Sequence, residues 1–384
     1  MRLLLIIFLT VFLVYSLSST EETPYNYFTR LSQSFLNGKL YISENPSWLN
    51  ELVPIDGKYY VVYPPMPAII LMPFVFLFKN HASQTLFSIF LGSINTILVY
   101  LLLKRLNFSK ETSLLSTFFF AFGTNYWYLS TVGSAWFLAH ITALFFLLLA
   151  LIEAFGKQRL LLMGLLLGAS FWARTPLIFT VFFFLIYFWK KFWPVNKKNI
   201  FNFLLFNLGI IFFVLMDGIY NFLRFGNLSP FSPYHLIPGI VKDPIFQQGF
   251  MSISYMPRHV VAMFTKLPRF TTSWPFLIPS LYSTAIWFTS PALIYILKVR
   301  KSLLTAACWV AILATLSVIV LWGGVGFAQF GYRFAQDFMP FLLILVALGI
   351  GQKPSKFAYF LVVLSILVNL WGVIMISFLN IWIM

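Results

Sequence analysis

The chain has 384 residues, 60% of them hydrophobic and only 9% charged, whereas soluble globular proteins carry roughly 25% charged residues. This composition excludes a soluble enzyme, because too few charges are present to cover a water-facing surface. Apolar runs of about 18 residues or more recur along the chain, and each is long enough to cross a hydrocarbon layer as a helix. We therefore expect an all-α polytopic membrane protein in which residues 1–384 form a single transmembrane domain.

The net charge of +16 arises from 26 Lys and Arg against 10 Asp and Glu. Basic residues of membrane proteins collect in cytoplasmic loops and face anionic headgroups. The charge therefore indicates membrane lipids as partners and gives no reason to expect nucleic acid. The single cysteine, Cys308, lies inside an apolar run, so neither a disulfide framework nor a cysteine-based metal site is available.

The first apolar run, residues 3–19, follows a basic start at Arg2. The same features are typical of a cleaved signal peptide, which is the alternative interpretation. A retained helix explains better how the later spans obtain their orientation. The predicted spans are residues 3–19, 84–103, 112–130, 136–155, 160–173, 175–189, 200–220, 274–297, 302–322, 336–350 and 357–382.

The loop charges predict the orientation of these spans. With the N-terminus in the cytoplasm, 15 of the 26 Lys and Arg residues fall in short cytoplasmic loops at helix ends, which is the bias that sets orientation. The apolar stretch 61–78 would reverse this pattern if it crossed the membrane, but it contains four prolines, which disfavour an uninterrupted helix. We interpret it as interfacial or re-entrant, in a multi-pass protein of the cytoplasmic (inner) membrane.

Eight of the ten acidic residues then lie outside, so groups able to act as acid or base gather on the outer face. Two long outer loops, residues 20–83 and 221–273, are the expected functional segments, because long loops between spans are more often functional than not. In the first loop, Tyr27, Leu31 and Phe35 recur at helical spacing. This spacing predicts an amphipathic helix that lies in the membrane interface.

Glu21 and Glu22 come directly after the first span, where the chain leaves the membrane on the outer side. Partial desolvation at this depth would raise the pKa of a carboxylate towards the operating pH, which suits a general base. The alternative is a pair of solvated acids at a helix end.

Two arginines stand in otherwise apolar surroundings. Arg174 lies in a hairpin between two short apolar runs, and Arg333 stands four residues before Asp337 at the start of the tenth span. Arginine near the bilayer interior is costly, so it normally faces a cavity, a partner or an anionic ligand. We expect both arginines to bind an anion, and the alternative for Arg174 is anchoring to lipid headgroups. For Asp337 we favour a structural ion pair with Arg333.

His140 lies one turn inside the fourth span beside Trp136, and a histidine within a membrane helix is a candidate for substrate binding. The four histidines are scattered, so a zinc site has little support, and the sequence leaves open whether a divalent metal takes part. Walker A, GxSxG and Rossmann motifs are absent from the sequence, which argues against nucleotide-driven chemistry.

Polar and aromatic residues of the two outer loops supply further substrate-binding candidates. The tyrosines of the first loop can stack on a sugar, although an aromatic belt at the interface explains them equally well. The basic cluster of the second loop is explained equally well by headgroup binding. These candidates are Asp56, Lys58, Tyr59 and Tyr60 in the first loop and Arg258 and Arg269 in the second.

Several motifs together resemble a known superfamily. They are EETPYNYF, FLNGKLYI and DGKYYVVYPPMPAIILMPF in the first outer loop, and WFLAHITALFFLLLAL, GASFWARTPLIF, YNFLRFG and GYRFAQDFMPFLL further along. This combination resembles the GT-C superfamily of polyprenyl-phosphate-dependent glycosyltransferases, and most closely the protein-O-mannosyltransferase and lipid A aminoarabinose transferase type.

The resemblance implies a GT-C-like bundle of about eleven transmembrane helices with an interfacial helix in the first outer loop. It implies an inverting transfer of sugar from a polyprenyl-phosphate donor to an acceptor hydroxyl on the outer face, with Glu22, or its neighbour Glu21, as catalytic base. The basic residues that it assigns to the donor phosphate are Arg174, Arg333, Lys58, Arg258 and Arg269.

We therefore predict a membrane glycosyltransferase whose acceptor is a lipid, a glycan or a protein. One alternative is a non-enzymatic transporter or flippase for lipid-linked sugars, although a transport path needs charges in mid-membrane and most predicted spans contain none. A second alternative is an assembly subunit that has kept the fold without the activity.

Overall fold

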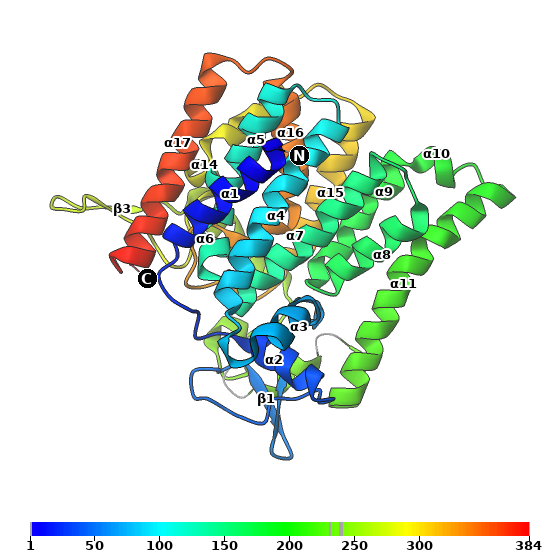
Figure 1. Cartoon of the computed structure of the whole chain (residues 1–384), viewed down its shortest axis with the longest axis vertical. Helices are drawn as coiled ribbons and strands as arrows, with labels where there is room; N and C mark the ends of the chain where they lie inside the picture. The colour runs from blue at the N-terminus through cyan, green and yellow to red at the C-terminus, as the bar shows by residue number, and fades with distance from the viewer. Residues whose placement is uncertain (1, 230–231, 238–240, 384) are drawn as a thin grey trace.

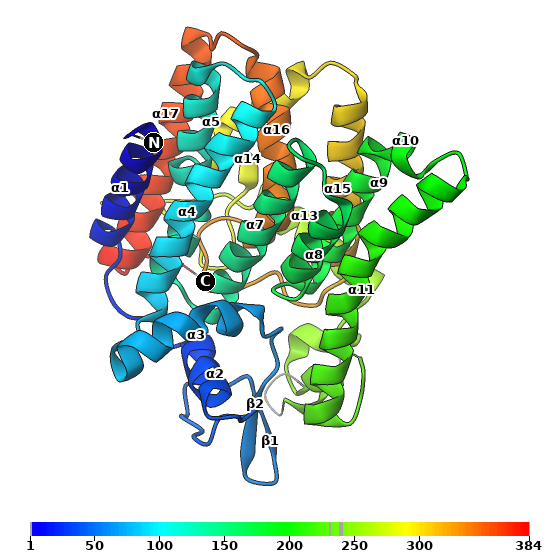
Figure 2. The same ribbon diagram turned by 45° about the vertical axis from the view of Figure 1, so that its right-hand side comes forward.

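The computed structural model describes residues 2–229, 232–237 and 241–383. It is mostly helical, with two small antiparallel hairpins. The helices α2 and α3 and the β1–β2 hairpin gather at one end of a bundle of long helices (Figure 1). The connection between α16 and α17 lies at the opposite end, and α1 runs along the side of the bundle with its start towards that end (Figure 2).

The bounds of the elements agree with most of the predicted spans. The α-helices are α1 (Arg2–Leu17), α2 (Tyr27–Leu36), α3 (Met66–Phe78), α4 (Gln84–Arg105), α5 (Lys110–Phe122), α6 (Tyr126–Val132), α7 (Ala135–Ala154), α8 (Leu160–Phe171), α9 (Val181–Tyr187), α10 (Trp189–Phe192), α11 (Lys197–Phe225), α13 (Met256–Val260), α14 (Ile286–Thr289), α15 (Leu303–Ile319), α16 (Met339–Ile350) and α17 (Lys356–Val373). The strands are β1 (Leu52–Ile55), β2 (Lys58–Val61), β3 (Arg269–Phe270) and β4 (Leu277–Ile278).

Five of the described helical segments are long and apolar enough to cross a membrane. They are Gln84–Arg105, Ala135–Ala154, Lys197–Phe225, Arg333–Ile350 and Lys356–Phe378. Five further apolar segments are shorter: Arg2–Leu17, Met66–Phe78, Leu160–Phe171, Thr175–Tyr187 and Leu303–Ile319. The ten segments include nine of the eleven predicted spans, together with the proline-containing stretch 61–78 as the short helix α3.

Two predicted spans are not continuous helices. The prediction over 274–297 is wrong: this stretch holds β4, the one-turn helix α14 and a 3-10 segment, Pro291–Lys298, because Pro275, Pro279 and Pro291 interrupt it. The predicted span 112–130 is divided into α5 and α6 around Gly123.

The predicted amphipathic helix of the first outer loop is present as α2. Its residues Tyr27, Phe28 and Leu31 are fully buried, and Gly38 follows its end with a positive φ of 68°, a conformation that suits glycine. The helix packs on α3, where the Ser32 hydroxyl donates a 2.6 Å hydrogen bond to the Ala68 carbonyl. The apolar face of α2 therefore rests on the protein itself.

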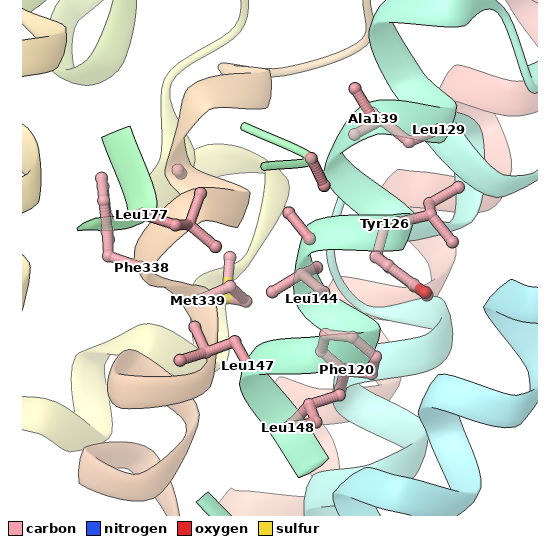
Figure 3. Close-up of a cluster of buried hydrophobic side chains, with 14 of the residues drawn as sticks. Phe120, Tyr126, Leu129, Ala139, Leu144, Leu147, Leu148, Leu177, Phe338 and Met339 are labelled. Atoms are coloured by element: carbon pink, nitrogen blue, oxygen red, sulfur yellow. The ribbon is translucent and has the colours of Figure 1, made fainter. Parts of the chain in front are cut away.

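The core lies among the middle turns of the long helices. Figure 3 shows Leu144 and Leu147 of α7 near Leu177, Phe338 and Met339, with Phe120 and Tyr126 on the other side of α7. Leu144, Leu147 and Phe120 are almost completely buried. The short 3-10 segments Thr175–Thr180 and Arg333–Phe338 precede α9 and α16, so regular α-helix is interrupted at both places beside this core.

Candidate active site

One face of α7 organises the polar groups at the α2–α3 end of the bundle. Trp136 and His140 stand four residues apart, which places them on one face about 6 Å apart along the helix axis. Trp136 donates a 3.2 Å hydrogen bond from Nε1 to the Glu51 carboxylate. His140 contacts Asp337 through Nδ1 at 2.8 Å. Two carboxylates from distant parts of the chain are thus held at neighbouring turns of one helix.

Glu51 lies just before β1 and is only partly exposed. Its carboxylate accepts hydrogen bonds from Trp136 and from the Tyr63 hydroxyl, and its backbone N–H donates to the Tyr27 hydroxyl at 3.2 Å. Burial raises the pKa of Glu51 from 4.5 to about 7, against the opposing effects of the Trp136 hydrogen bond and the positive charge of Arg333. A carboxyl with this pKa changes protonation state near neutral pH.

Asp337 forms a two-point ion pair with Arg174. The Oδ1 atom accepts from Arg174 Nε at 2.7 Å and Oδ2 accepts from Arg174 Nη2 at 2.8 Å. Arg174 stands in extended backbone between α8 and the 3-10 segment Thr175–Thr180, and Asp337 stands in the 3-10 segment before α16. The two side chains therefore meet where regular α-helix is interrupted, after α8 and before α16. Arg333, which four-residue spacing pairs with Asp337, does not form this ion pair.

Arg333 is a buried cation without an ion pair among the described residues. Its Nη1 atom donates to the Phe327 carbonyl at 3.3 Å, and its Nε atom has no hydrogen-bond partner in the described part of the chain. The guanidinium lies 5.2 Å from the Phe334 ring centroid, and the Arg174 guanidinium lies 5.7 Å from the same ring. Both cations therefore flank one aromatic ring, and the electrostatic neighbours of Arg333 include Glu51 and Asp337.

The loop 221–273 contributes two aromatic residues, Tyr234 and His259, to the surroundings of these charged groups. Tyr234 lies within electrostatic range of Glu51 and Arg174, and its ring packs 5.2 Å from the ring of Trp322. His259 joins this loop to the segment that carries Arg333: its Nδ1 lies 2.6 Å from the Tyr332 hydroxyl, and its Nε2 lies 2.8 Å from the Trp322 carbonyl.

The four charged residues Glu51, Arg174, Arg333 and Asp337 are named the charge cluster below. Three of the residues proposed from the sequence, Arg174, Arg333 and His140, belong to it or touch it. Burying Arg333 and Asp337 and partly burying Arg174 is costly unless these charges are paired or bind a ligand. Since Asp337 neutralises one guanidinium and Glu51 titrates near neutral pH, the charge cluster retains positive charge for an anion.

The structure does not bring the two acids after α1 to the charge cluster. Glu21 is exposed. Glu22 binds the first turn of α4, where its carboxylate accepts from the Gln84 N–H at 2.8 Å and from the Ser83 hydroxyl. A carboxylate at a helix N-terminus is a favourable cap, and in the described part of the chain no basic group lies within ion-pair distance of Glu22.

The remaining candidates lie on the periphery. Asp56 and Lys58 are exposed at the tip of the β1–β2 hairpin, and Lys58 lies over the Tyr41 ring. Tyr59 pairs with Ile42 through its backbone, and Tyr60 packs against Phe225. Arg258 donates to the carbonyls of Ile245 and Gly323, and Arg269 is exposed in β3, which projects beside α17 (Figure 1). In the part of the chain that the structure describes, none of these six residues forms a hydrogen bond or an ion pair with the charge cluster.

Sequence reasoning counted Glu51 only as one of the outer acids. The signal that marks it is spatial, because Glu51 gains its partners Tyr63, Trp136 and Arg333 from three separate segments. Its neighbourhood in the sequence, PSWLNELVP, resembles an ordinary exposed loop. Among the described residues no three His, Cys, Asp or Glu side chains converge as in a metal site.

The fold is similar to that of the Archaeoglobus fulgidus oligosaccharyltransferase in its apo form, with a TM-score of 0.50 and 15% sequence identity. The match covers 96% of this chain and 55% of that one, so the chain spans about half the length of that enzyme. No curated protein matches the chain at a significant level. At this identity the likeness concerns the fold alone, and together with the apolar helices it defines the class: a polytopic membrane protein that shares the fold of that enzyme.

The family model for dolichyl-phosphate-mannose-protein mannosyltransferase matches residues 1–225, which is more than half of the chain. The chain belongs to this family. The resemblance inferred from the motifs of the first outer loop is thereby confirmed at the level of a GT-C membrane glycosyltransferase.

Proposed function

We propose that the chain is an inverting glycosyltransferase that moves a sugar from a polyprenyl-phosphate donor to an acceptor hydroxyl at the outer face of the membrane. The observation that carries the proposal is the charge cluster, in which a carboxyl with a pKa near neutrality lies near the charge of Arg333, and Arg333 in turn lies near the charge of Arg174. The name of its family, which specifies dolichyl-phosphate-mannose, supports a lipid-phosphate donor.

The two arginines suit the phosphate of such a donor. The phosphodiester carries one negative charge, and the leaving phosphate gains a second as the bond between sugar C1 and oxygen breaks. Arg174 has N–H groups that Asp337 does not use, and the buried Nε of Arg333 has no hydrogen-bond partner among the described residues. Preorganised cations in a site shielded from water stabilise developing charge most effectively.

Glu51 suits the role of general base. The acceptor hydroxyl attacks sugar C1 on the side opposite the phosphate, and the Glu51 carboxylate takes its proton. The products are the glycosylated acceptor with inverted configuration and polyprenyl phosphate. A base whose pKa lies near the working pH is deprotonated in a substantial fraction of the molecules at that pH and is still basic enough to accept a proton from the hydroxyl.

The outer-face location is supported by the distribution of basic residues. The connections 106–109, 155–159, 188–196, 299–302 and 351–355 lie at the end of the bundle opposite to α2 and the β1–β2 hairpin (Figure 2). The basic residues of these connections and of the adjoining helix ends are typical of the cytoplasmic side. The charge cluster lies towards the other end, next to the first outer loop.

The family resemblance implies Glu22 as base, whereas the geometry favours Glu51, and one comparison separates them. Purified protein in liposomes is supplied with a radiolabelled polyprenyl-phosphate sugar and with membranes that contain the native acceptor. We expect Glu51→Gln to lower transfer by about 10²–10⁴-fold and Glu22→Gln to retain it. Loss of transfer in Glu22→Gln together with full transfer in Glu51→Gln would falsify the assignment to Glu51.

A further inference from the structure

In the two-point ion pair between Arg174 and Asp337, the aspartate is almost completely shielded from solvent. The Asp337 side chain is 1% exposed and that of His140 is 0% exposed, whereas that of Arg174 is 15% exposed. Asp337 is therefore closed off from a ligand in the site. Only the edge of Arg174 that Asp337 does not hold can face the donor.

His140 completes this arrangement from behind. Because its Nδ1 lies 2.8 Å from Asp337 Oδ1 and a carboxylate only accepts, Nδ1 carries the proton and donates it. The Nε2 atom is buried without a hydrogen-bond partner among the described residues. Asp337 Oδ1 thus receives two donors, Arg174 Nε and His140 Nδ1, which together fix the plane of the carboxylate.

We infer that Asp337 and His140 are positioning residues that aim Arg174 at the donor phosphate. This inference rests on the proposed function and assigns a role to the site that the two arginines form. A planar guanidinium held along one edge presents its remaining N–H groups in a fixed direction. The chain supplies the three parts from three places: α7, the break after α8, and the 3-10 segment before α16.

The charge of Asp337 separates positioning from direct binding. Asp337→Asn removes one negative charge and leaves the positive charges of Arg174 and Arg333, so the site attracts an anion more strongly. The same change removes the anchor of Arg174, so the guanidinium no longer points in one direction. Ground-state binding of the phosphate and turnover should therefore change in opposite directions, since a small misplacement costs up to about 10²-fold in rate.

The experiment uses the full-length protein in nanodiscs, with polyprenyl monophosphate as the binding probe and a radiolabelled polyprenyl-phosphate sugar as the donor. We expect Asp337→Asn to bind the probe several-fold more tightly, with full stoichiometry, while kcat falls about 10–100-fold. Arg174→Ala should weaken probe binding and lower kcat together. Glu153→Gln, which breaks the ion pair with Arg159 at the opposite end of the bundle, is the matched control and should leave both values unchanged.

Two variants of His140 test its role. They also test the positioning role if Asp337→Asn does not fold. His140→Asn keeps an N–H donor near the position of Nδ1, and His140→Leu does not. We expect His140→Asn to keep kcat within about threefold and His140→Leu to lower it about tenfold, with probe binding retained in both.

The positioning role is overturned if the wild-type protein transfers sugar and Asp337→Asn keeps its kcat, or weakens probe binding as Arg174→Ala does. Equal kcat values for His140→Asn and His140→Leu would show that His140 has no part in positioning Arg174. A wild-type protein that neither binds the probe nor transfers sugar would defeat the proposed function itself, and is distinguished in this way from failure of the positioning role alone.

Discussion

At the scale of single residues, the environment of a carboxylate decides its chemistry more than its place in the sequence. Glu22 stands where the resemblance places a catalytic acid, yet it binds backbone N–H groups at the start of α4. Glu51 lies 29 positions later and is held by Trp136 and Tyr63 beside the charge of Arg333. Of the two, only Glu51 combines burial with a cation nearby.

The pKa of Glu51 predicts how transfer depends on pH. Burial raises this pKa from 4.5 to about 7, so the carboxyl is protonated below pH 7 and cannot accept a proton from the acceptor. We expect kcat/KM to fall about tenfold per pH unit below pH 7 and to reach a plateau above it.

The measurement is kcat/KM from pH 5.5 to 8.5 at constant ionic strength. Glu22→Gln is the control and should keep the same profile. A wild-type profile that stays flat across this range would contradict the assignment of the base.

Arg174 and Arg333 could be identified from the sequence because a charge in an apolar run costs free energy and needs a reason. Their partners could not. The four-residue spacing of Arg333 and Asp337 suggested a pair on one helix, but Asp337 lies in a 3-10 segment and pairs with Arg174, 163 positions away. Contacts of this range depend on how breaks in different helices meet, which local patterns do not encode.

At the scale of elements, hydropathy predicted the continuous helices and failed where prolines interrupt apolar runs. The spans over 136–155 and 302–322 are observed as α7 and α15 almost residue for residue. The stretch 274–297 contains no charged residues, but its prolines remove backbone donors and divide it into short pieces. Apolar composition predicts that a segment enters the membrane. Whether the segment forms one continuous helix depends on its backbone hydrogen bonds.

The packing of α8 on α11 depends on small residues. Gly164 and Gly168 of α8 stand four apart and face Gly209 of α11 so closely that a Cβ atom on Gly209 would collide with the backbone of Leu165 and Gly164. Small residues at such spacing let two membrane helices approach without a hydrophobic driving force. Since α8 leads directly to Arg174, this contact also supports the site.

We expect Gly209→Val to destabilise the protein by about 1–3 kcal/mol or more, because the added methyl groups force the two backbones apart. The measurement is the thermal unfolding midpoint in detergent. Gly218→Ala on the same helix is the matched control: among the described residues its added Cβ would meet only Leu228, at 3.6 Å, so no loss of stability is expected. Equal midpoints for Gly209→Val and the wild type would refute this account of the contact.

At the scale of the whole molecule, the chain separates two kinds of surface. One end holds the basic connections between the long helices, and the other holds α2, α3 and the β1–β2 hairpin (Figure 1). The charge cluster lies towards this second end, since Glu51 directly precedes β1. Positive charge retained on the cytoplasmic side fixes such an orientation. The proposed outer-face chemistry therefore depends on which end faces out.

The single cysteine makes this orientation measurable. Cys308 is buried in α15, so a Cys308→Ala variant provides a cysteine-free background. We expect a cysteine introduced at Asp56 to react with a membrane-impermeant maleimide in intact cells, and one at Lys353 to react only after the membrane is permeabilised. The opposite labelling pattern would place the charge cluster on the cytoplasmic side and contradict the proposed topology.

The location of the donor phosphate is the most direct test of the proposed site, and a cryo-EM structure of the protein in nanodiscs with a bound polyprenyl-phosphate sugar would measure it. We predict phosphate density within hydrogen-bond distance of both Arg174 and Arg333, with sugar C1 facing Glu51. Phosphate density beside Lys58, Arg258 or Arg269, away from Arg174 and Arg333, would contradict the proposed site.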